Sequence, residues 1–239
     1  MQLPNIIFIF LLAAAMLATY KSKKLTAPGI LTGGIVAIAI YLGVGFIGIA
    51  MLGAFFVLSV LATSFGKSAK RKLNPEYNDP EQRDAGQVLA NGGMAALLGT
   101  AAYYLQDQAT VLVILTAAAF ASATADTLSS ELGTVFGRRF YNIVTLKPDQ
   151  KGRDGVISLE GTLIGVAGSA VISLIYSLGF GWNINSLFII IAGTIGNLTD
   201  SVLGATLERK NRLNNNAVNF LNTAVAVISC WIMIKVFHS

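Results

Sequence analysis

Residues 111–133 read VLVILTAAAFASATADTLSSELG. Apolar and small residues fill the first part of this stretch, and Asp126 and Glu131 then follow among threonines and serines. A helix that crosses a bilayer needs about 17–25 predominantly apolar residues. The stretch therefore predicts a membrane-spanning helix with carboxylates near the surface of the bilayer.

The composition of the whole chain agrees with this interpretation. Of its 239 residues, 54% are hydrophobic and 12% are charged, and the mean hydropathy is +0.65. A soluble domain carries about 25% charged residues. We expect an all-α, polytopic transmembrane helical bundle of about six to eight spans, forming a single integral membrane domain over residues 1–239. The candidate spans are 5–20, 28–46, 48–65, 86–105, 109–128, 160–180, 186–206 and 217–237, with GVGFIG separating the second from the third.

Charge placement predicts the orientation. All but one of the 17 Lys and Arg residues fall in the loops 21–27, 66–85, 129–159 and 207–216, and the exception is Lys235. The positive-inside rule places these long basic loops in the cytoplasm and both termini on the opposite side. All the acidic residues except Asp107 lie on the same side as these loops. No motif supports nucleic-acid binding.

Two returning spans end in related sequences, ATADTLSSELG and NLTDSVLGATLE. Each carries Asp, then a hydroxyl residue, then apolar residues, with Gly a few positions later. We interpret this as a weak parallel repeat of a helical hairpin. The hypothesis places Asp126 and Asp200 at equivalent depths, in one cytosolic cavity.

Asp200 is one indication of a functional site. On a continuous helix Asp200, Gly204 and Glu208 share one face, and Gly204 leaves a notch that suits a polyanion with a divalent cation. Ionisable residues at membrane depth are functional by default. The alternative is that Asp200 is paired with a basic residue or capped, and only holds helices together.

Asp126 and Glu131 point about 140° apart on a regular helix. They can join one site if the helix breaks near Ser129, or if they contact different neighbours. Thr127 and Glu131 do share a face. The alternative for Glu131 is a solvated charge at the end of a helix.

The basic loop and the amides form two further groups. In the loop 138–160, Lys151, Arg153 and Asp154 are candidates for a functional role, with Lys151 and Arg153 able to bind phosphates. The alternative is a basic loop beside anionic headgroups. Amides such as Asn91, Asn197, Asn219 and Asn222 gather at cytosolic helix ends, where interhelical hydrogen bonding is the alternative role.

The kinds of side chain limit the chemistry. Carboxylates with hydroxyls and amides suit a hard cation such as Mg²⁺, which also takes substrate phosphates as ligands. The only histidine, His238, lies beside the C-terminus, so a Ser-His-Asp triad or a His-ligated zinc on the cytosolic side is excluded. The single cysteine, Cys230, excludes an intrachain disulfide, and no Walker A motif is present.

Five stretches in order carry a family resemblance: QVLANGG (87–93), ADTLSSELG (125–133), GRDGVISLEGTLIG (152–165), GNLTDSVLGATLE (196–208) and NNAVNFLNT (215–223). Together they resemble the integral-membrane family catalogued as domain of unknown function ninety-two, which includes a plant chloroplast phytyl-phosphate kinase. The resemblance covers nearly the whole chain. It implies transfer of a nucleotide γ-phosphate to an isoprenyl monophosphate, with CTP as the expected donor.

The resemblance also implies a set of motif residues. Asn216 departs from the family pattern, in which an acidic residue often precedes Ala-Val-Asn. The positions carried over are Asn91, Asp126, Thr127, Ser130, Glu131, Asp154, Glu160, Asn197, Asp200, Ser201, Glu208 and Asn219.

We therefore expect a Mg²⁺-dependent prenyl-phosphate kinase, with a nucleoside triphosphate, an isoprenyl monophosphate and the membrane as partners. Asp126 and Asp200, helped by Glu131 or Glu208, are the expected catalytic and metal-binding residues, and Lys151 and Arg153 would neutralise phosphate charge. The full set of expected metal ligands is Asp126, Asp200, Glu131, Glu208, Asp154 and Glu160. The expected substrate-binding residues are Lys151, Arg153, Asn91, Asn197, Asn219, Thr127, Ser130 and Ser201.

The alternative is a transporter or flippase for an isoprenyl phosphate or a similar anionic lipid, using the polar cluster as its binding site. A carrier needs a polar route to the far face. The outer halves AIAIYLGV, LLGTAAYYL and ISLIYSLGF carry almost no polar residues, which favours the enzyme. The sequence leaves open whether the chain forms homo-oligomers.

Overall fold

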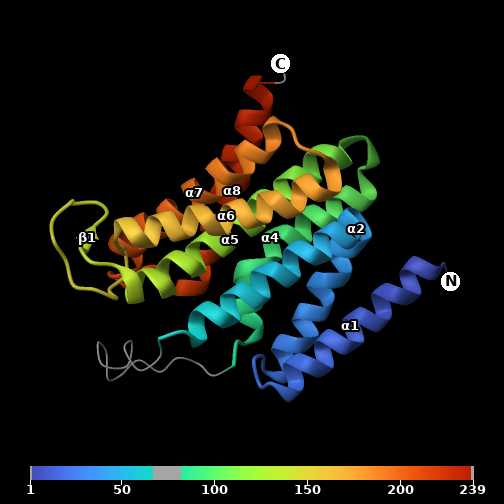
Figure 1. Cartoon of the computed structure of the whole chain (residues 1–239), viewed down its shortest axis with the longest axis horizontal. Coiled ribbons are helices and arrows are strands. Elements are labelled where there is room, and N and C mark those ends of the chain that lie inside the picture. Colours follow the sequence, from blue (N-terminus) through green and yellow to red (C-terminus); the bar gives the residue numbers. More distant parts are fainter. Residues whose placement is uncertain (1, 67–81, 238–239) are drawn as a thin grey trace.

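The computed structural model describes residues 2–66 and 82–237, which form a bundle of α-helices (Figure 1). The basic residues Lys67, Lys70, Arg71 and Lys72, together with His238, lie outside these ranges. The helices of the described ranges are α1 (Leu3–Lys21), α2 (Ala27–Ser64), α4 (Ala85–Tyr104), α5 (Ala109–Phe136), α6 (Leu159–Phe180), α7 (Ile184–Leu203) and α8 (Asn215–Phe237). The shorter elements are the 3₁₀-helix η1 (Gln106–Gln108), the π-helix η2 (Gly204–Glu208), and the strands β1 (Tyr141–Asn142) and β2 (Val156–Ile157).

Six of the helices are long and apolar enough to cross a membrane: α1, α2, α5 together with η1, α6, α7 together with η2, and α8. The helix α4 is present where the sequence predicts one, but it is not among those six. The prediction of a polytopic helical bundle is confirmed. The predicted end of the 109–128 span is wrong, because α5 continues as a regular helix to Phe136.

Gly45 divides α2 into two halves. Its φ of 69° and ψ of −154° interrupt the helix, a conformation that glycine adopts without steric cost. Both ends of the α2 region, Lys24 and Thr63, line the same cavity, and Figure 1 shows the second half running back beside the first. The predicted break within GVGFIG is confirmed, and one long helical stretch supplies both predicted spans.

Four helices begin at this same end of the bundle, each with a polar cap. Thr26 Oγ1 accepts from Gly29 N at the start of α2, and Ser158 Oγ accepts from Gly161 N at the start of α6. Asp84 and Gln87 form a capping box at the start of α4. Asn214 Oδ1 accepts from Ala217 N as α8 begins. These caps satisfy backbone N–H groups that the first turn of a helix leaves without partners.

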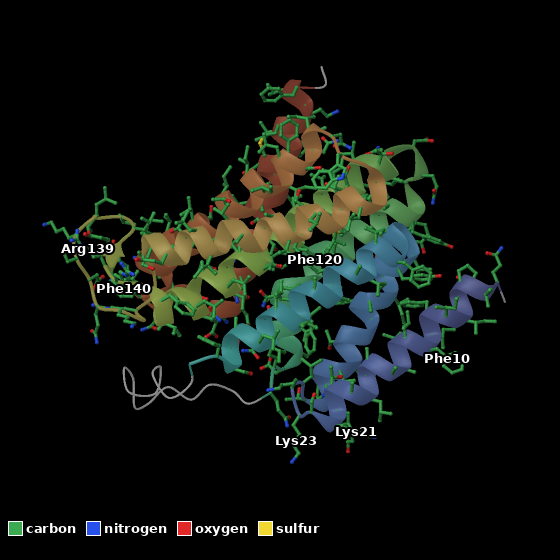
Figure 2. The ribbon with its side chains drawn as sticks, in the orientation of Figure 1. Phe10, Lys21, Lys23, Phe120, Arg139 and Phe140 are labelled. Carbon is green, nitrogen blue, oxygen red and sulfur yellow. The ribbon has the colours of Figure 1, made fainter. Side chains whose placement is uncertain are left out.

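The centre of the bundle is α5, which packs against α2, α4, α6, α7 and α8. From Val113 to Asp126 every residue of α5 is buried. Most of these residues are Ala, Ser or Thr, which let neighbouring helices approach closely. Phe120 is the one large aromatic residue in this run and lies inside the bundle beside Phe55 (Figure 2).

The far end of the bundle carries buried hydroxyls. Ser173 Oγ donates to the Ser186 carbonyl at 2.6 Å, and the Ser177 and Ser186 hydroxyls are 2.7 Å apart. The expectation that the outer halves carry almost no polar residues is therefore wrong for the α6 segment ISLIYSLGF, which carries Ser173 and Ser177. The serine hydroxyls bond to one another and to the backbone, and so join α6 to α7.

Candidate active site at the helix ends

A cavity of about 380 Å³ lies where α4, α6 and α8 begin and where α2, α5 and α7 end. Its wall consists mostly of carboxylates, amides and hydroxyls. Twelve of the predicted site residues line it: Asn91, Asp126, Thr127, Ser130, Glu131, Arg153, Asp154, Asn197, Asp200, Ser201, Glu208 and Asn219.

Asp126 and Asp200 meet in this cavity. Their carboxyl groups are within hydrogen-bonding reach of each other, so α5 and α7 bring the two residues to the same depth. The prediction of one shared cavity is confirmed. Asp126 is only 9% exposed, and within the described residues neither carboxylate forms an ion pair with Lys or Arg. The alternative in which Asp200 is paired with a basic residue is therefore not observed.

Two buried side chains fix the orientation of Asp200. Ser122 Oγ donates to Asn222 Oδ1 at 2.9 Å, which turns the amide nitrogen of Asn222 the other way. Asn222 Nδ2 then donates to Asp200 Oδ1, also at 2.9 Å. Because Ser122 and Asn222 are fully buried, α5, α7 and α8 hold this carboxylate in one position.

A second bond ties α5 to α7 beside the carboxylates. Ser129 Oγ donates to Asn197 Oδ1 at 2.7 Å, with Gly165 of α6 packed against both helices. A Cβ at Gly165 would lie 2.6 Å from Asn197 Nδ2 and 3.1 Å from the Ala125 carbonyl. The small residues of α6 therefore allow Asn197 and Ser129 to meet.

Glu131 contacts the other side of the cavity. The helix does not break near Ser129, so Asp126 and Glu131 point in different directions and contact different neighbours. Thr63 Oγ1 at the end of α2 donates to Glu131 Oε1 at 3.2 Å. Arg83 Nη2 in turn donates to Thr63 Oγ1 at 3.4 Å. Of the two arrangements that the sequence left open, the structure has the second.

The Asp200–Glu208 segment differs from the predicted continuous helix. The helix α7 ends at Leu203, and the π-helix η2 carries Gly204 to Glu208. Gly204 offers no open notch for a polyanion, because a Cβ there would lie 3.0 Å from Gly155 N. The loop backbone fills this space. Glu208 nevertheless lines the cavity, as does Asp154 of that loop.

Arg209 holds the loop in place. Its Nε donates to the Asp154 carbonyl at 2.6 Å, and its Nη1 lies 2.9 Å from Asp149 Oδ2. The hydrogen bond from Gln150 N, followed by that from Arg209, lowers the pKa of Asp149 below its usual value. The pairing of β1 with β2 closes the base of the same loop.

Lys151 and Glu160 are not among the residues that line the cavity, and their part in the site stays a prediction. The Lys151 ammonium lies over the ring of Phe140, 5.3 Å from its centroid. Glu160 Oε2 accepts from the backbone N–H of Arg138 at 3.4 Å. Figure 2 shows Arg139 and Phe140 in this loop at one end of the bundle, and Phe140 itself lines the cavity. Arg153 remains as the cation that the loop contributes to the cavity.

The predicted set of six metal ligands is not assembled as a cluster. Across residues 2–66 and 82–237, no three His, Cys, Asp or Glu side chains converge closely enough to hold a metal ion by themselves. Asp126 and Asp200 form a pair. Mg²⁺ is commonly held by one or two carboxylates and completes its shell with water and substrate phosphates. The pair fits that mode of binding.

The sequence reasoning missed several residues of the cavity, among them two cations and the hydroxyl residue Thr63. Lys24, Thr63 and Arg83 line it together with the predicted residues. Lys24 and Arg83 are both basic residues of loops, and no local feature of the sequence separates them from the other basic loop residues.

Comparison with known proteins agrees with this architecture. The family described as integral membrane protein DUF92 matches residues 10–227. The chain belongs to the DUF92 family of integral membrane proteins. The matched range includes the α5 and α7 carboxylates and the cavity loop.

The DUF92 relatives come from archaea, cyanobacteria and plants. An uncharacterized membrane protein of Methanocaldococcus jannaschii, MJ0933, is 35% identical, and the match covers 93% of this chain and 92% of the relative. One of Synechocystis, sll0875, is 30% identical over 91% of this chain and 86% of its own length. The chloroplastic protein VTE6 of Arabidopsis thaliana is 26% identical over 96% of this chain and 70% of its own length. No solved structure matches the chain.

Proposed function

We propose that this DUF92 protein is a Mg²⁺-dependent kinase that converts an isoprenyl monophosphate to the diphosphate at the membrane surface. The observation that carries the proposal is the buried Asp126–Asp200 pair, which lies in a polar cavity at one end of an apolar bundle. Two adjacent carboxylates repel each other unless a cation or a proton lies between them. A nucleotide that brings Mg²⁺ would supply that cation.

The reaction needs little from the protein beyond position and charge. An oxygen of the isoprenyl monophosphate attacks the γ-phosphorus of the nucleoside triphosphate. The bond from that phosphorus to the oxygen that bridges it to the β-phosphate breaks, and the nucleoside diphosphate leaves with its electron pair. The attacking phosphate is already ionised, so no strong general base is required. Within the described residues, the side chains that line the cavity include no histidine.

Each side of the cavity has a role in this scheme. Bound Mg²⁺ would offset the negative charge of the transferring phosphoryl group. Asp126 and Asp200 would hold the ion, and Asn222 keeps Asp200 aimed into the cavity. Arg153 would contact nucleotide phosphates from the loop. Glu208 and Asp154, at the rim, would contact water around the ion.

The identity of the substrates rests on the family resemblance. That resemblance implies an isoprenyl monophosphate as acceptor and CTP as donor. The site itself supports a more general statement about the ligands. It suits a polyphosphate with a divalent cation that reacts with the headgroup of a lipid. The positive-inside rule favours a cytosolic position for the cavity, and a soluble nucleotide would be available on that side.

The test is an assay of purified protein in detergent. Isoprenyl monophosphates of several chain lengths are incubated with Mg²⁺ and each of the four nucleoside triphosphates, and the diphosphate product is measured. We expect Mg²⁺-dependent product, with CTP as the preferred donor. Chelation of Mg²⁺ should stop the reaction.

The same preparation distinguishes the carrier alternative. Compartments are absent in detergent, so transport contributes nothing there. Protein that binds isoprenyl monophosphate, forms no diphosphate with any nucleotide, and moves the lipid between leaflets of liposomes would be a carrier instead.

A further inference from the structure

The cavity also has a cationic wall, formed by Lys24 and Arg83. Lys24 precedes α2 and Arg83 precedes α4, and both side chains line the cavity with Thr63, Gln87 and Asn91. The carboxylates come from α5 and α7. The aspartate pair and the cationic wall therefore come from different helices and their flanking segments.

Backbone pairing places the two cations together. Arg83 N donates to the Lys24 carbonyl at 3.0 Å, and Thr26 N donates to the Arg83 carbonyl at 3.0 Å. These two bonds form a parallel bridge centred on Leu25 and Arg83. The segments are 58 residues apart in the chain (25 to 83), so the close placement of Lys24 and Arg83 is a product of the fold.

Gly29 makes this approach possible. A Cβ at position 29 would lie 2.7 Å from the Arg83 carbonyl oxygen and 3.4 Å from the carbonyl carbon of Asp84. Because the obstructing atoms are backbone, they cannot turn aside as a flexible side chain would. Any side chain at position 29 would push the Arg83 segment away from α2.

Thr63 and Glu131 orient the Arg83 side chain. The Thr63 hydroxyl accepts from Arg83 Nη2 at 3.4 Å and donates to Glu131 Oε1 at 3.2 Å. Arg83 is half-buried, where a guanidinium is held more firmly and screened less than on an open surface. Glu131 therefore acts through Thr63 as a positioning residue for Arg83.

We propose that Lys24 and Arg83 form the subsite that binds the phosphate of the isoprenyl monophosphate. This inference rests on the proposed function. In-line transfer requires the two phosphate groups to face each other. The Asp126–Asp200 pair and Arg153 serve the nucleotide on one side, and the acceptor dianion then needs cations on the other. A guanidinium binds a phosphate through two parallel hydrogen bonds, which fixes the direction of attack.

The test measures binding in detergent without turnover. The probes are farnesyl monophosphate, farnesol as its match without phosphate, and CTP with Mg²⁺. We expect Arg83→Gln to weaken binding of farnesyl monophosphate by about tenfold or more, since a charge-assisted hydrogen bond is lost. Binding of farnesol and of CTP should stay unchanged. Arg83→Lys should recover part of the affinity, because the charge remains without the planar fork.

Matched variants separate this subsite from general charge and from folding. Lys24→Gln should also weaken farnesyl monophosphate binding, whereas Lys210→Gln, at an exposed lysine that does not line the cavity, should not. Gly29→Ala should weaken it without removing any charge. Gly53→Ala is its control, because a Cβ at position 53 meets nothing within 4 Å.

Any of three results for Arg83→Gln would overturn the assignment. The variant could bind farnesyl monophosphate as tightly as wild type, or its affinity for farnesol could fall as much as its affinity for farnesyl monophosphate. The third result is a loss of affinity for CTP alone. The result that would contradict the kinase proposal is a different one. Protein that binds farnesyl monophosphate through Arg83 but forms no diphosphate would keep the subsite and lose the reaction.

Discussion

The two helices that carry the carboxylates, α5 and α7, enter the cavity with related sequences and end differently. In α5, ADTLSSELG remains a regular helix to Phe136, and Glu131 faces Thr63 of α2. In α7, TDSVLGATLE turns into the π-helix η2, and Glu208 faces the loop that carries Asp154. The aspartates coincide in depth while the glutamates diverge to opposite walls.

This difference indicates that the two helices share one role, the formation of the aspartate pair, and that each glutamate has a role of its own. Asp126 and Asp200 form a pair because the two helices place them at the same depth in the bundle. After the aspartates, α5 contacts the cationic wall through Glu131 and Thr63. The segment that follows α7 carries Glu208 to the loop that contains Asp154. π-helical turns recur at functional sites, because the extra residue redirects the side chains that follow. The shared part should therefore tolerate change least.

Asp200→Asn should have the largest effect. The substitution keeps the shape and can still accept from Asn222 Nδ2, but it removes the negative charge that is proposed to hold Mg²⁺. We expect diphosphate formation to fall on the order of a thousandfold, with the melting temperature in detergent retained. Asp107→Asn, at an exposed carboxylate in the turn before α5, is the control and should leave the rate unchanged. An Asp200→Asn rate close to that of wild type would reduce this carboxylate to a packing role.

Gly165→Ala should have the next largest effect, because it separates α5 from α7. The added methyl group would lie 2.6 Å from Asn197 Nδ2, so α6 or Asn197 must shift. We expect a loss of roughly 1–3 kcal/mol in the free energy of unfolding and a rate lower by on the order of tenfold to a hundredfold. The measurements are melting in detergent and the initial rate.

Gly53→Ala is the control for Gly165→Ala, since it adds the same methyl group to open space. If both variants lose the same stability, the effect comes from helix glycines in general. The contact between Asn197 and Ser129 would then be incidental.

Much of this comparison could be predicted from the sequence. Apolar runs predict the helices, and the related ADT and TDS motifs predict that Asp126 and Asp200 meet, because both features depend on periodicity along one segment. The break at Gly45 follows from the clustered glycines of GVGFIG.

The remaining features depend on contacts between distant segments. The notch at Gly204 is filled by Gly155, and Lys151 lies over Phe140 instead of lining the cavity. Glu131 meets Thr63, which is 68 residues earlier in the chain. No local pattern in the sequence specifies these partners. The cationic wall was overlooked for the same reason, since Lys24 and Arg83 meet through backbone pairing.

Arg209→Gln should have a smaller effect, confined to the α7 side. It removes the contacts to Asp149 and to the Asp154 carbonyl, so the loop should become more mobile. We expect a rate lower by roughly three- to tenfold and faster proteolysis of the loop. Arg212→Gln, at an exposed arginine nearby, should change neither. Equal effects of the two substitutions would argue against a specific role for the Arg209 contacts.

The Arg209–Asp149 contact also predicts a pH dependence. The pKa of Asp149 is lowered in the folded protein, so its stabilising contribution is present above its unfolded value of about 4. The contribution is lost as the pH falls through the lowered pKa. Loop proteolysis by an acid-active protease should therefore rise only at strongly acidic pH in wild type. In Arg209→Gln it should already be fast at pH values above that range.

The most direct test of the central claim compares wild type with Asp126→Asn in one detergent preparation. The protein is given isoprenyl monophosphate, Mg²⁺ and CTP labelled at the γ-phosphate, and label in the lipid diphosphate is followed over time. Wild type should transfer label in a Mg²⁺-dependent reaction, and Asp126→Asn should transfer none above background while remaining folded. The account is contradicted if wild type binds both substrates without transferring label, or if Asp126→Asn transfers label as fast as wild type.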